Sequence, residues 1–367
     1  MTLGGLATNG DFDPHFKIFH DLMAFKVQAI LLVSSRYDAF IMEEDGSLAT
    51  RLINEYHGLN LSKPPKITRA SSAEAALEMI RDGGYDLVIT MPYLGGMDAF
   101  AFGALIKQIR PDLPVILVAH SLRSTFADKV DGGGVDGVFL WCCSADLLLA
   151  IIKNVEDHRN ADADIGRAMV RVIIYVEDSP LYRALFLPLI YSEVVRQTQS
   201  VLDESLNERH RLLRMRARPK ILLATCYEEA VDLYRRYSTS VFAVISDVRF
   251  RRKGVIDPAA GIAFLRQLRA ARADLPLLMV STEEGNRPLA ERMPAVFLDK
   301  NSPQIKEELH AFFLQHLGFG DFIFRLADDS PIARAGNLRD FEQQLGLIPD
   351  ESLRYHASHN HFSHWVM

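Results

Sequence analysis

The chain is poor in the features that mark secreted and membrane-spanning proteins. Its 367 residues include only three cysteines, and two of them, Cys142 and Cys143, are adjacent, so neither a disulfide framework nor a zinc spacing is present. No stretch approaches about 18 apolar residues without charge, and acidic side chains interrupt the N-terminal region where a signal peptide needs an apolar run. These absences predict a cytoplasmic protein without a membrane segment.

An excess of positive charge is also missing. The formal net charge is -6 at pH 7, which argues against a nucleic-acid partner, because such proteins usually carry a basic surface. The most basic stretch, residues 209–220, could grip a phosphate backbone or form the solvated face of a long helix, and we favour the helix. No glycine-rich phosphate loop occurs, so the sequence predicts no nucleotide site.

Strand and helix patterns alternate five times in the first half of the chain. Short apolar runs between polar turns are typical of parallel strands that are covered on both faces, and apolar residues at helical spacing lie between them. A short helix over residues 14–25 is expected to precede the first strand. The predicted strands are 29–33, 66–70, 86–90, 114–119 and 138–141, and the predicted helices are 72–82, 99–110 and 145–158.

The same pattern restarts after a small, polar stretch that indicates a linker. The predicted strands of this second series are 171–176, 220–224, 241–245, 276–280 and 295–298, and its helices include 228–237, 259–271 and 302–317. We therefore expect an α/β protein with two doubly wound (βα)5 domains, each around a five-stranded parallel sheet. The expected division is an N-terminal tail and helix 1–25, a first domain 26–158, a linker 159–170, a second domain 171–318 and a C-terminal segment 319–367.

About 40 residues separate the first two strands of the second series, where a crossover needs only about a dozen. Residues 179–219 keep apolar side chains at helical spacing and hold few breakers, so the pattern predicts a long first helix. Such a helix would be longer than a small domain is wide. Its apolar stripe then needs a partner, either a second subunit in a homodimer or the first domain.

Reactive side chains follow the strands of the second series. Glu177 and Asp178 follow its first strand, Asp247 its third, Ser281 its fourth and Lys300 its fifth. In an open parallel sheet these strand ends lie at one edge, where ligands bind. Clustered carboxylates suit Mg²⁺, a carboxylate can serve as a nucleophile, and lysine and serine can bind phosphoryl oxygens. The sequence therefore predicts a site that accepts a phosphoryl group on Asp247.

On these residues the second series resembles the response-regulator receiver domain of two-component signalling. The resemblance implies a Mg²⁺ site made by Glu177, Asp178, Asp247 and the backbone carbonyl of Arg249, with Asp247 as phosphoacceptor. It also implies a switch formed by Ser281 and Phe297, and a sensor histidine kinase or a small phosphodonor as partner. The expected role is phosphorelay signalling rather than enzyme catalysis. The long basic loop after Asp247 departs from the family. It could steer an anionic phosphodonor or be a solvated loop, and we favour the solvated loop.

The first series lacks every one of these groups. Its strands end in Ser34 and Ser35, Met91, Ala119 and Trp141 where the family has acids, aspartate, a hydroxyl residue and lysine. The turn Met97-Asp98-Ala99 resembles the Met-Asp-Gly turn of receivers. We interpret this copy as a pseudo-receiver used for packing or protein contact. An alternative function is therefore a non-phosphorylated dimerisation or interaction scaffold.

The C-terminal segment holds a histidine cluster, His356, His359, His361 and His364, for which packing is favoured over a metal site or phosphohistidine. A helix is expected around residues 337–345. The runs GFGDF and IPDESL resemble the segment that follows two receiver-like domains in bacterial PEP/pyruvate-binding proteins of the pyruvate phosphate dikinase type. This resemblance implies that the chain is a regulatory fragment. The cognate kinase, the output partner and the sign of regulation are not encoded in any recognisable motif.

Overall fold

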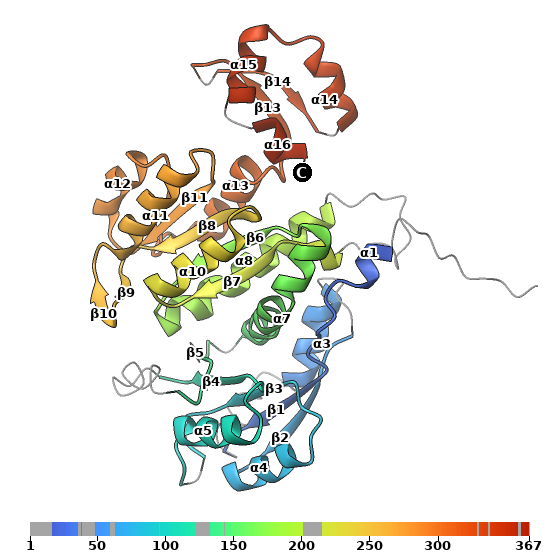
Figure 1. The fold of residues 1–367 in the computed structure, drawn as a ribbon, viewed down its shortest axis with the longest axis vertical. Helices are drawn as coiled ribbons and strands as arrows, with labels where there is room; N and C mark the ends of the chain where they lie inside the picture. Colours follow the sequence, from blue (N-terminus) through green and yellow to red (C-terminus); the bar gives the residue numbers. More distant parts are fainter. Residues whose placement is uncertain are drawn as a thin grey trace, which may run out of the picture.

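The computed structural model describes residues 17–366 apart from 36–37, 39–47, 59–62, 95, 122–132, 143, 201–214, 329, 337 and 359–360. Two α/β domains and a smaller C-terminal unit follow one another along the longest axis of the molecule (Figure 1). In the part of the chain that is described, no helix has the length and apolar character that a bilayer span requires.

The first domain is built on five parallel strands, β1 (Ala29–Val33), β2 (Lys66–Ala70), β3 (Leu87–Thr90), β4 (Val115–Ala119) and β5 (Gly137–Leu140). They lie in the order β2-β1-β3-β4-β5. The helices α3 (Leu48–Gly58), α4 (Ala73–Arg81), α5 (Ala99–Ile109) and α7 (Ala145–Ala168) cover the sheet. All of β3 and β4 is buried, as their uninterrupted apolar sequences predict.

The second domain repeats this arrangement. Its parallel strands are β6 (Val172–Val176), β7 (Lys220–Ala224), β8 (Val241–Asp247), β11 (Leu277–Ser281) and β12 (Val296–Asp299), in the order β12-β11-β8-β6-β7. Its helices are α8 (Pro180–Ser200), α10 (Tyr227–Tyr237), α11 (Ala260–Ala271), α12 (Arg287–Glu291) and α13 (Ile305–His316), with the short 3-10 turns η3 (Met215–Ala217) and η4 (Glu284–Asn286). Both sheets have the same order counted along their own domain, which confirms the predicted pair of doubly wound folds.

The segment 319–367 is a folded unit and not a tail. The strands β13 (Phe322–Arg325) and β14 (Pro331–Ala335) form an antiparallel hairpin that packs with α14 (Leu338–Leu345), α15 (Asp350–Ser358) and α16 (His361–Val366). Aromatic side chains, among them Phe322, Phe324 and Phe341, form its core. The helix expected around 337–345 is confirmed.

Within this unit His356 is a buried packing residue. Its Nε2 accepts a hydrogen bond of 2.7 Å from the backbone N–H of Arg325, so the imidazole proton sits on Nδ1. That nitrogen lies 2.9 Å from Nδ1 of His361 and donates to it. The ring also packs against Phe322 and Phe324. Both nitrogens of His356 are thus used inside the protein, while His359 and the side chain of His364 lie outside the described residues.

The predicted linker over residues 159–170 is wrong, because α7 continues without a break to Ala168 and ends at Met169 in the left-handed conformation. Two of the polar residues that indicate a linker, Asn160 and Asp164, are buried acceptors on one face of this helix, as is Glu156 one turn earlier. Asp164, Asn160 and Glu156 accept hydrogen bonds from the backbone N–H groups of residues 23, 25 and 27. This part of α7 is polar because a second chain segment lies along it and donates backbone hydrogen bonds to its side chains.

That second segment corrects the helix expected over residues 14–25. Only α1 (Lys17–His20) is helical in its described part. The chain then bends at residues 21–23, where Met23 has a positive φ, and continues without regular secondary structure to β1. In an extended chain, every second backbone N–H group lies about 6.6 Å further along. Side chains four residues apart on an α-helix are separated by a rise of about 6 Å, which is close to that spacing. The side chains of residues 156, 160 and 164 on α7 therefore accept from the alternate amides of residues 27, 25 and 23. We call residues 21–28 the N-terminal strap.

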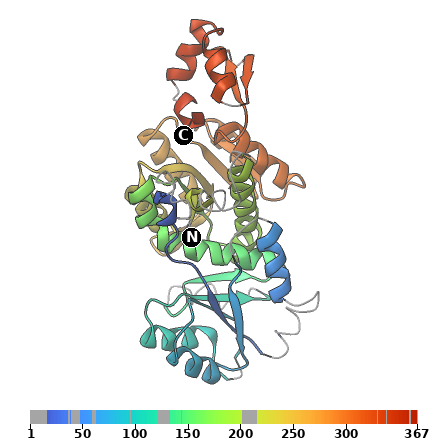
Figure 2. The same cartoon turned by 90° about the vertical axis from the view of Figure 1, so that its right-hand side faces the viewer.

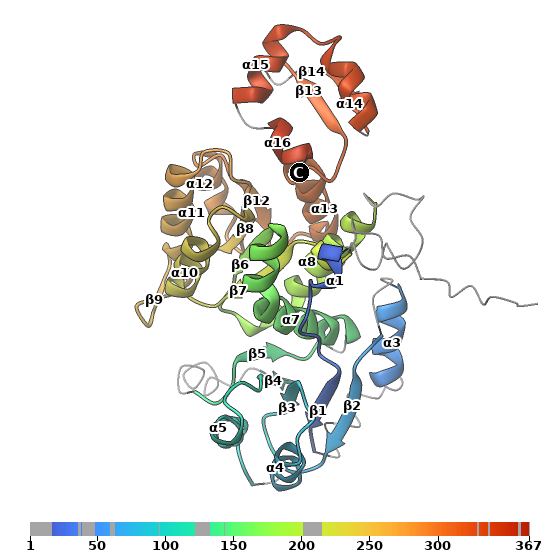
Figure 3. The ribbon, with the colours of Figure 1, turned by 45° about the vertical axis from the view of Figure 1, so that its right-hand side comes forward.

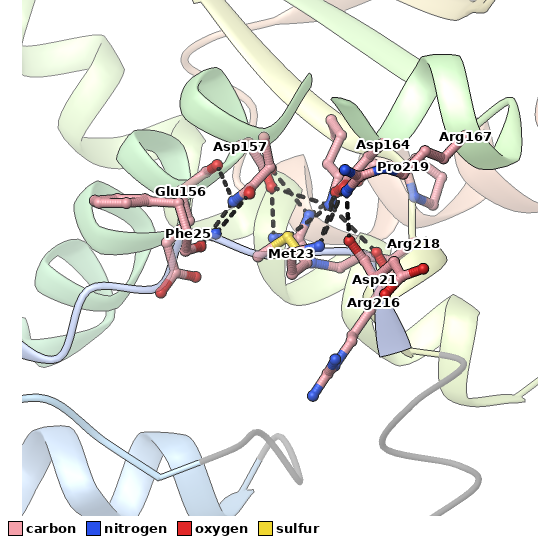
Figure 4. A network of polar contacts seen from close by, with 12 residues as sticks. Asp21, Met23, Phe25, Glu156, Asp157, Asp164, Arg167, Arg216, Arg218 and Pro219 are labelled. Atoms are coloured by element: carbon pink, nitrogen blue, oxygen red, sulfur yellow. Dashed lines mark hydrogen bonds and ion pairs between the residues drawn. The ribbon is translucent and has the colours of Figure 1, made fainter. Parts of the chain in front are cut away.

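A buried ionic network joins the strap and α7 to the second domain (Figure 4). Arg218 forms two hydrogen bonds of 2.9 Å with the carboxylate of Asp157, and Lys220 lies 2.8 Å from Asp164. Both cations are almost completely buried. The basic stretch 209–220 is thus not a solvated helix face in its described part, and Arg209, Arg211 and Arg214 lie outside the described residues.

The helix α8 is covered by the first domain. Its buried side chains share one continuous hydrophobic core with residues of β5 and α7. In Figure 1, Figure 2 and Figure 3 alike, α7 lies between the two sheets. Of the two partners expected for the long helix, the first domain is confirmed for residues 180–200. The continuation through 201–214, and with it the expected dimer contact, lies outside the described residues.

Candidate functional site

The predicted site residues meet at the carboxyl edge of the second sheet. Asp247 and Ser281 are the last residues of β8 and β11. Glu177 and Asp178 follow β6, and Lys300 follows β12. Because β6, β8, β11 and β12 are consecutive neighbours in the sheet, their ends form a single cluster.

The three carboxylates are close enough to share one cation. Each of Glu177, Asp178 and Asp247 offers an oxygen that lies within 4.8 Å of the others. Glu177 and Asp247 are 1% and 8% exposed, while Asp178 is half-buried. Three hard oxygen ligands, of which those of Asp178 and Asp247 line a cavity, fit Mg²⁺, which keeps part of its hydration shell. Arg249 lines the same cavity, of about 260 Å³, together with Ser281 and Lys300.

Lys300 partly neutralises this acidic cluster. Its Nζ lies 2.6 Å from Oε2 of Glu177 and 3.0 Å from Oδ1 of Asp247, and it stands 4.1 Å from the ring centroid of Tyr182. Burial and the charge of Asp247 raise the pKa of Glu177 to about 7. Burial likewise raises the pKa of Asp178 and of Asp247. The folded site therefore holds more negative charge than one lysine can offset, which favours a cation.

The residues that the resemblance assigns to a switch are held by the loop that follows β11. The Ser281 hydroxyl accepts hydrogen bonds from the backbone N–H of Glu283 at 3.1 Å and from Nδ2 of Asn286 at 3.0 Å. The guanidinium of Arg287 lies 4.6 Å from the ring centroid of Phe297. Asn286 and Arg287 were not identified from the sequence, because their roles depend on the fold of this loop.

Asp247 is held by its own strand end and by a close helix. Its Oδ1 accepts a hydrogen bond of 2.8 Å from the backbone N–H of Val248. A Cβ on Gly261, in the first turn of α11, would lie 2.0 Å from the carbonyl oxygen of Asp247. Only glycine permits this approach. In the sequence, this close approach is indicated only by a glycine at the start of an otherwise regular helix.

The basic segment after Asp247 is a β-hairpin and not an irregular loop, although its turn and second strand are largely exposed to solvent as expected. The strands β9 (Phe250–Arg252) and β10 (Val255–Asp257) pair antiparallel across a turn at Lys253 and Gly254, both of which have positive φ. Such turns usually hold Asn, Asp or Gly at the first position and Gly at the second. Here only the second position, Gly254, matches that pattern. Ile256 from this hairpin and the adjacent Pro258 line the cavity beside Asp247.

At the corresponding edge of the first sheet the matching strand-end positions hold neither an acid nor a lysine, although Asp38 lies near this edge, hydrogen-bonded to Ser35 and 3.5 Å from His120. Met91, Ala119 and Trp141 are buried there, as is Ser34. Asp98 of the receiver-like turn caps α5 by accepting hydrogen bonds from the backbone N–H groups of Phe100 and Ala101. Among the described strand-end positions of the first sheet, Met91 stands where a phosphoacceptor aspartate would be and Trp141 where a phosphoryl-binding lysine would be.

No protein-family model matches the chain, and no curated protein matches it. The solved structures similar to it include the N-terminal domain of a response regulator/sensory box/GGDEF protein from Carboxydothermus hydrogenoformans, with 23% identity and a TM-score of 0.30 over 37% of this chain and 99% of that one. A response regulator from Thermotoga maritima in complex with Mg²⁺ and BeF has 20% identity and a TM-score of 0.27, over 35% and 98% of the two chains. A two-component response regulator/GGDEF protein has 16% identity and a TM-score of 0.32 over 77% of this chain and 95% of the other. The fold assignment rests on the strand order of this chain, and these likenesses carry no statement about its activity.

Proposed function

We propose that the second domain is a receiver that accepts a phosphoryl group on Asp247 with Mg²⁺ bound by Glu177, Asp178, Asp247 and the carbonyl of Arg249. The observation that carries the proposal is the convergence of three carboxylates, one hydroxyl and one lysine at a single sheet edge. The phosphodonor is a sensor histidine kinase or a small molecule. The modified domain then switches a partner or a downstream domain.

The side chains have distinct tasks in this transfer. An oxygen of the Asp247 carboxylate attacks phosphorus, the bond from phosphorus to the donor breaks, and the bonding electrons leave with the donor atom. Bound Mg²⁺ would shield the negative charges that approach one another. Lys300, already 3.0 Å from Asp247, binds a phosphoryl oxygen as a point charge. Ser281 leaves Asn286 and binds another, which shifts the loop after β11 and Phe297 between two arrangements.

Phosphorylation with acetyl phosphate and Mg²⁺ tests the proposal directly. Intact mass should show a gain of one phosphoryl group on the wild-type chain and none on Asp247→Asn. Asp257→Asn, in the hairpin beside the same cavity, removes a carboxylate from the neighbourhood and should leave the gain unchanged. Equal gain on wild type and Asp247→Asn would place the acceptor elsewhere. The absence of a gain across several phosphodonors would refute the proposal.

Mg²⁺ binding should weaken as pH falls through about 7. The pKa of Glu177 is about 7, so its carboxylate is mostly charged at pH 8 and mostly protonated at pH 6. Mg²⁺ binds only the charged form, and the affinity should therefore fall about tenfold between these pH values through this group alone. Titration calorimetry at both pH values measures the change. Glu177→Gln should bind weakly at both and lose most of the pH dependence.

A second candidate is a constitutive interaction scaffold, favoured by the buried, unreactive edge of the first sheet and by its packing against α8. In this function the chain dimerises through residues 179–219 or regulates an attached PEP/pyruvate-binding domain without phosphorylation. Sizing by light scattering with and without acetyl phosphate separates the two candidates. A change of oligomeric state that requires Asp247 supports the receiver, whereas an unchanged dimer in every condition supports the scaffold.

A further inference from the structure

A buried arginine stands directly behind the acidic cluster. Arg183, in the first turn of α8, is 3% exposed. Its Nη2 donates a long hydrogen bond of 3.4 Å to the backbone carbonyl of Asp178. Its Nε has no hydrogen-bond partner, and no carboxylate lies within ion-pair distance of it among the residues that the structure describes. A buried cation without an ion pair is costly, so its retention calls for a role.

The first domain holds this arginine in place. The guanidinium carbon lies 5.5 Å from the ring centroid of Phe139, in strand β5 of the first sheet. Phe139 is itself buried in the hydrophobic core that β5 shares with α7 and α8. An aromatic face attracts a desolvated cation, so the contact fixes the guanidinium at the boundary of the two domains.

The field of Arg183 reaches the acidic residues. Burial lowers the pKa of the Arg183 guanidinium, and the charge of Glu177 is the largest influence that raises it again, with Asp178 adding to the effect. In return Arg183 lowers the pKa of Asp178, against the larger effects of burial and Asp247. The arginine thus acts on the carboxylates through space, without occupying the oxygens that a cation would bind.

We propose that Arg183, held against Phe139, is a positioning residue that sets the Mg²⁺ affinity of the acidic site, so that the first domain forms part of the site in the second. This inference rests on the metal site of the proposed function. Arg183 repels a bound divalent cation and thereby keeps its affinity below the value that the three carboxylates alone would give. Because coupling is reciprocal, Mg²⁺ binding also weakens the docking of Arg183 on Phe139 and connects site occupancy to domain packing.

The test is the Mg²⁺ affinity of the full chain, measured by titration calorimetry. Arg183→Met keeps the length of the side chain and removes its charge, and it should tighten binding by at least about tenfold. Arg183→Lys keeps the charge and should stay within about twofold of wild type. Phe139→Leu keeps an apolar side chain without a ring face, and it should tighten binding in the same direction as Arg183→Met.

Two further variants define the comparison. Arg196→Met removes an exposed arginine from the same helix, where it pairs with Glu193 at a distance from the acidic cluster, and should leave the affinity unchanged. The double variant Phe139→Leu/Arg183→Met should bind no more tightly than Arg183→Met alone, because the ring acts only through the guanidinium.

The direction of the effect separates a tuning role from structural damage, since a damaged site binds Mg²⁺ more weakly. Equal affinity in wild type, Arg183→Met and Phe139→Leu, with wild type binding normally, would overturn this inference and leave the proposed function intact. Weaker binding by Arg183→Met would overturn it as well. If wild type binds no Mg²⁺, the metal site of the proposed function fails first.

Discussion

Replacing Asp157 by alanine is expected to lower the free energy of unfolding by about 3–5 kcal/mol. The Asp157 carboxylate is fully buried and accepts hydrogen bonds from Arg218, from the Tyr191 hydroxyl and from the backbone N–H of Ile221. Arg218 and Lys220 hold its pKa below the usual range despite burial. Its removal leaves the cation of Arg218 buried without its partner, so the loss exceeds the value of an ordinary hydrogen bond.

Urea unfolding followed by circular dichroism measures this loss. The matched control is Asp162→Ala, on the same helix, which removes an exposed ion pair with Arg236 and should cost at most about 1 kcal/mol. Adding Arg218→Met to Asp157→Ala should restore part of the stability, because the second substitution removes the unpaired charge. A loss for Asp157→Ala no larger than that of Asp162→Ala would show that the ionic network does not stabilise the domain junction.

Replacing Lys300 by methionine is expected to slow phosphorylation of Asp247 by about 10²–10³-fold, the usual effect of removing one preorganised group that stabilises developing negative charge. The Nζ of Lys300 already lies between Glu177 and Asp247, so it needs no rearrangement to reach a phosphoryl oxygen. Mg²⁺ binding should persist or tighten in the same variant, because Lys300 competes with the cation for the two carboxylates. Loss of rate with retained metal binding distinguishes this role from unfolding.

The rate is measured by intact mass after timed reaction with acetyl phosphate. Lys306→Met, which removes an exposed lysine in the nearby helix α13, is the control and should react as wild type does. If Lys300→Met reacts within about twofold of wild type, the lysine serves only to neutralise buried carboxylates, a role that needs no contact with the transferred group.

The receiver-like edge of the second sheet could be predicted because it depends on local sequence. Asp247, Ser281 and Lys300 each stand at the end of an apolar run that forms a strand of the sheet, and parallel strands bring such ends together whatever the remaining packing. Asn286, Arg287 and Gly261 were missed, because each acts through a close contact with one side chain or carbonyl. Such contacts depend on loop and helix positions that periodicity does not encode.

The hairpin after Asp247 shows the same limit. Four basic residues within the five positions 249–253 indicate a solvated loop, yet β9 and β10 pair and Ile256 lines the cavity. The antiparallel pairing is stabilised by contacts with another segment, since Arg252 lies over the ring of Tyr227 and the backbone N–H of Lys253 donates to Glu228. Those partners precede the hairpin by more than twenty residues.

By itself, the sequence of this protein determined two doubly wound domains, the order of their elements and the residues at the carboxyl ends of the strands, because these follow from hydrophobic periodicity. Only the tertiary structure decided where the polar and charged residues between the domains lie. Residues 159–168 continue α7 instead of forming a linker, and Arg218 is buried, not solvated. The physical reason is that the environment of a charged side chain is set by its partner, and Asp157 reaches Arg218 across 61 residues of chain.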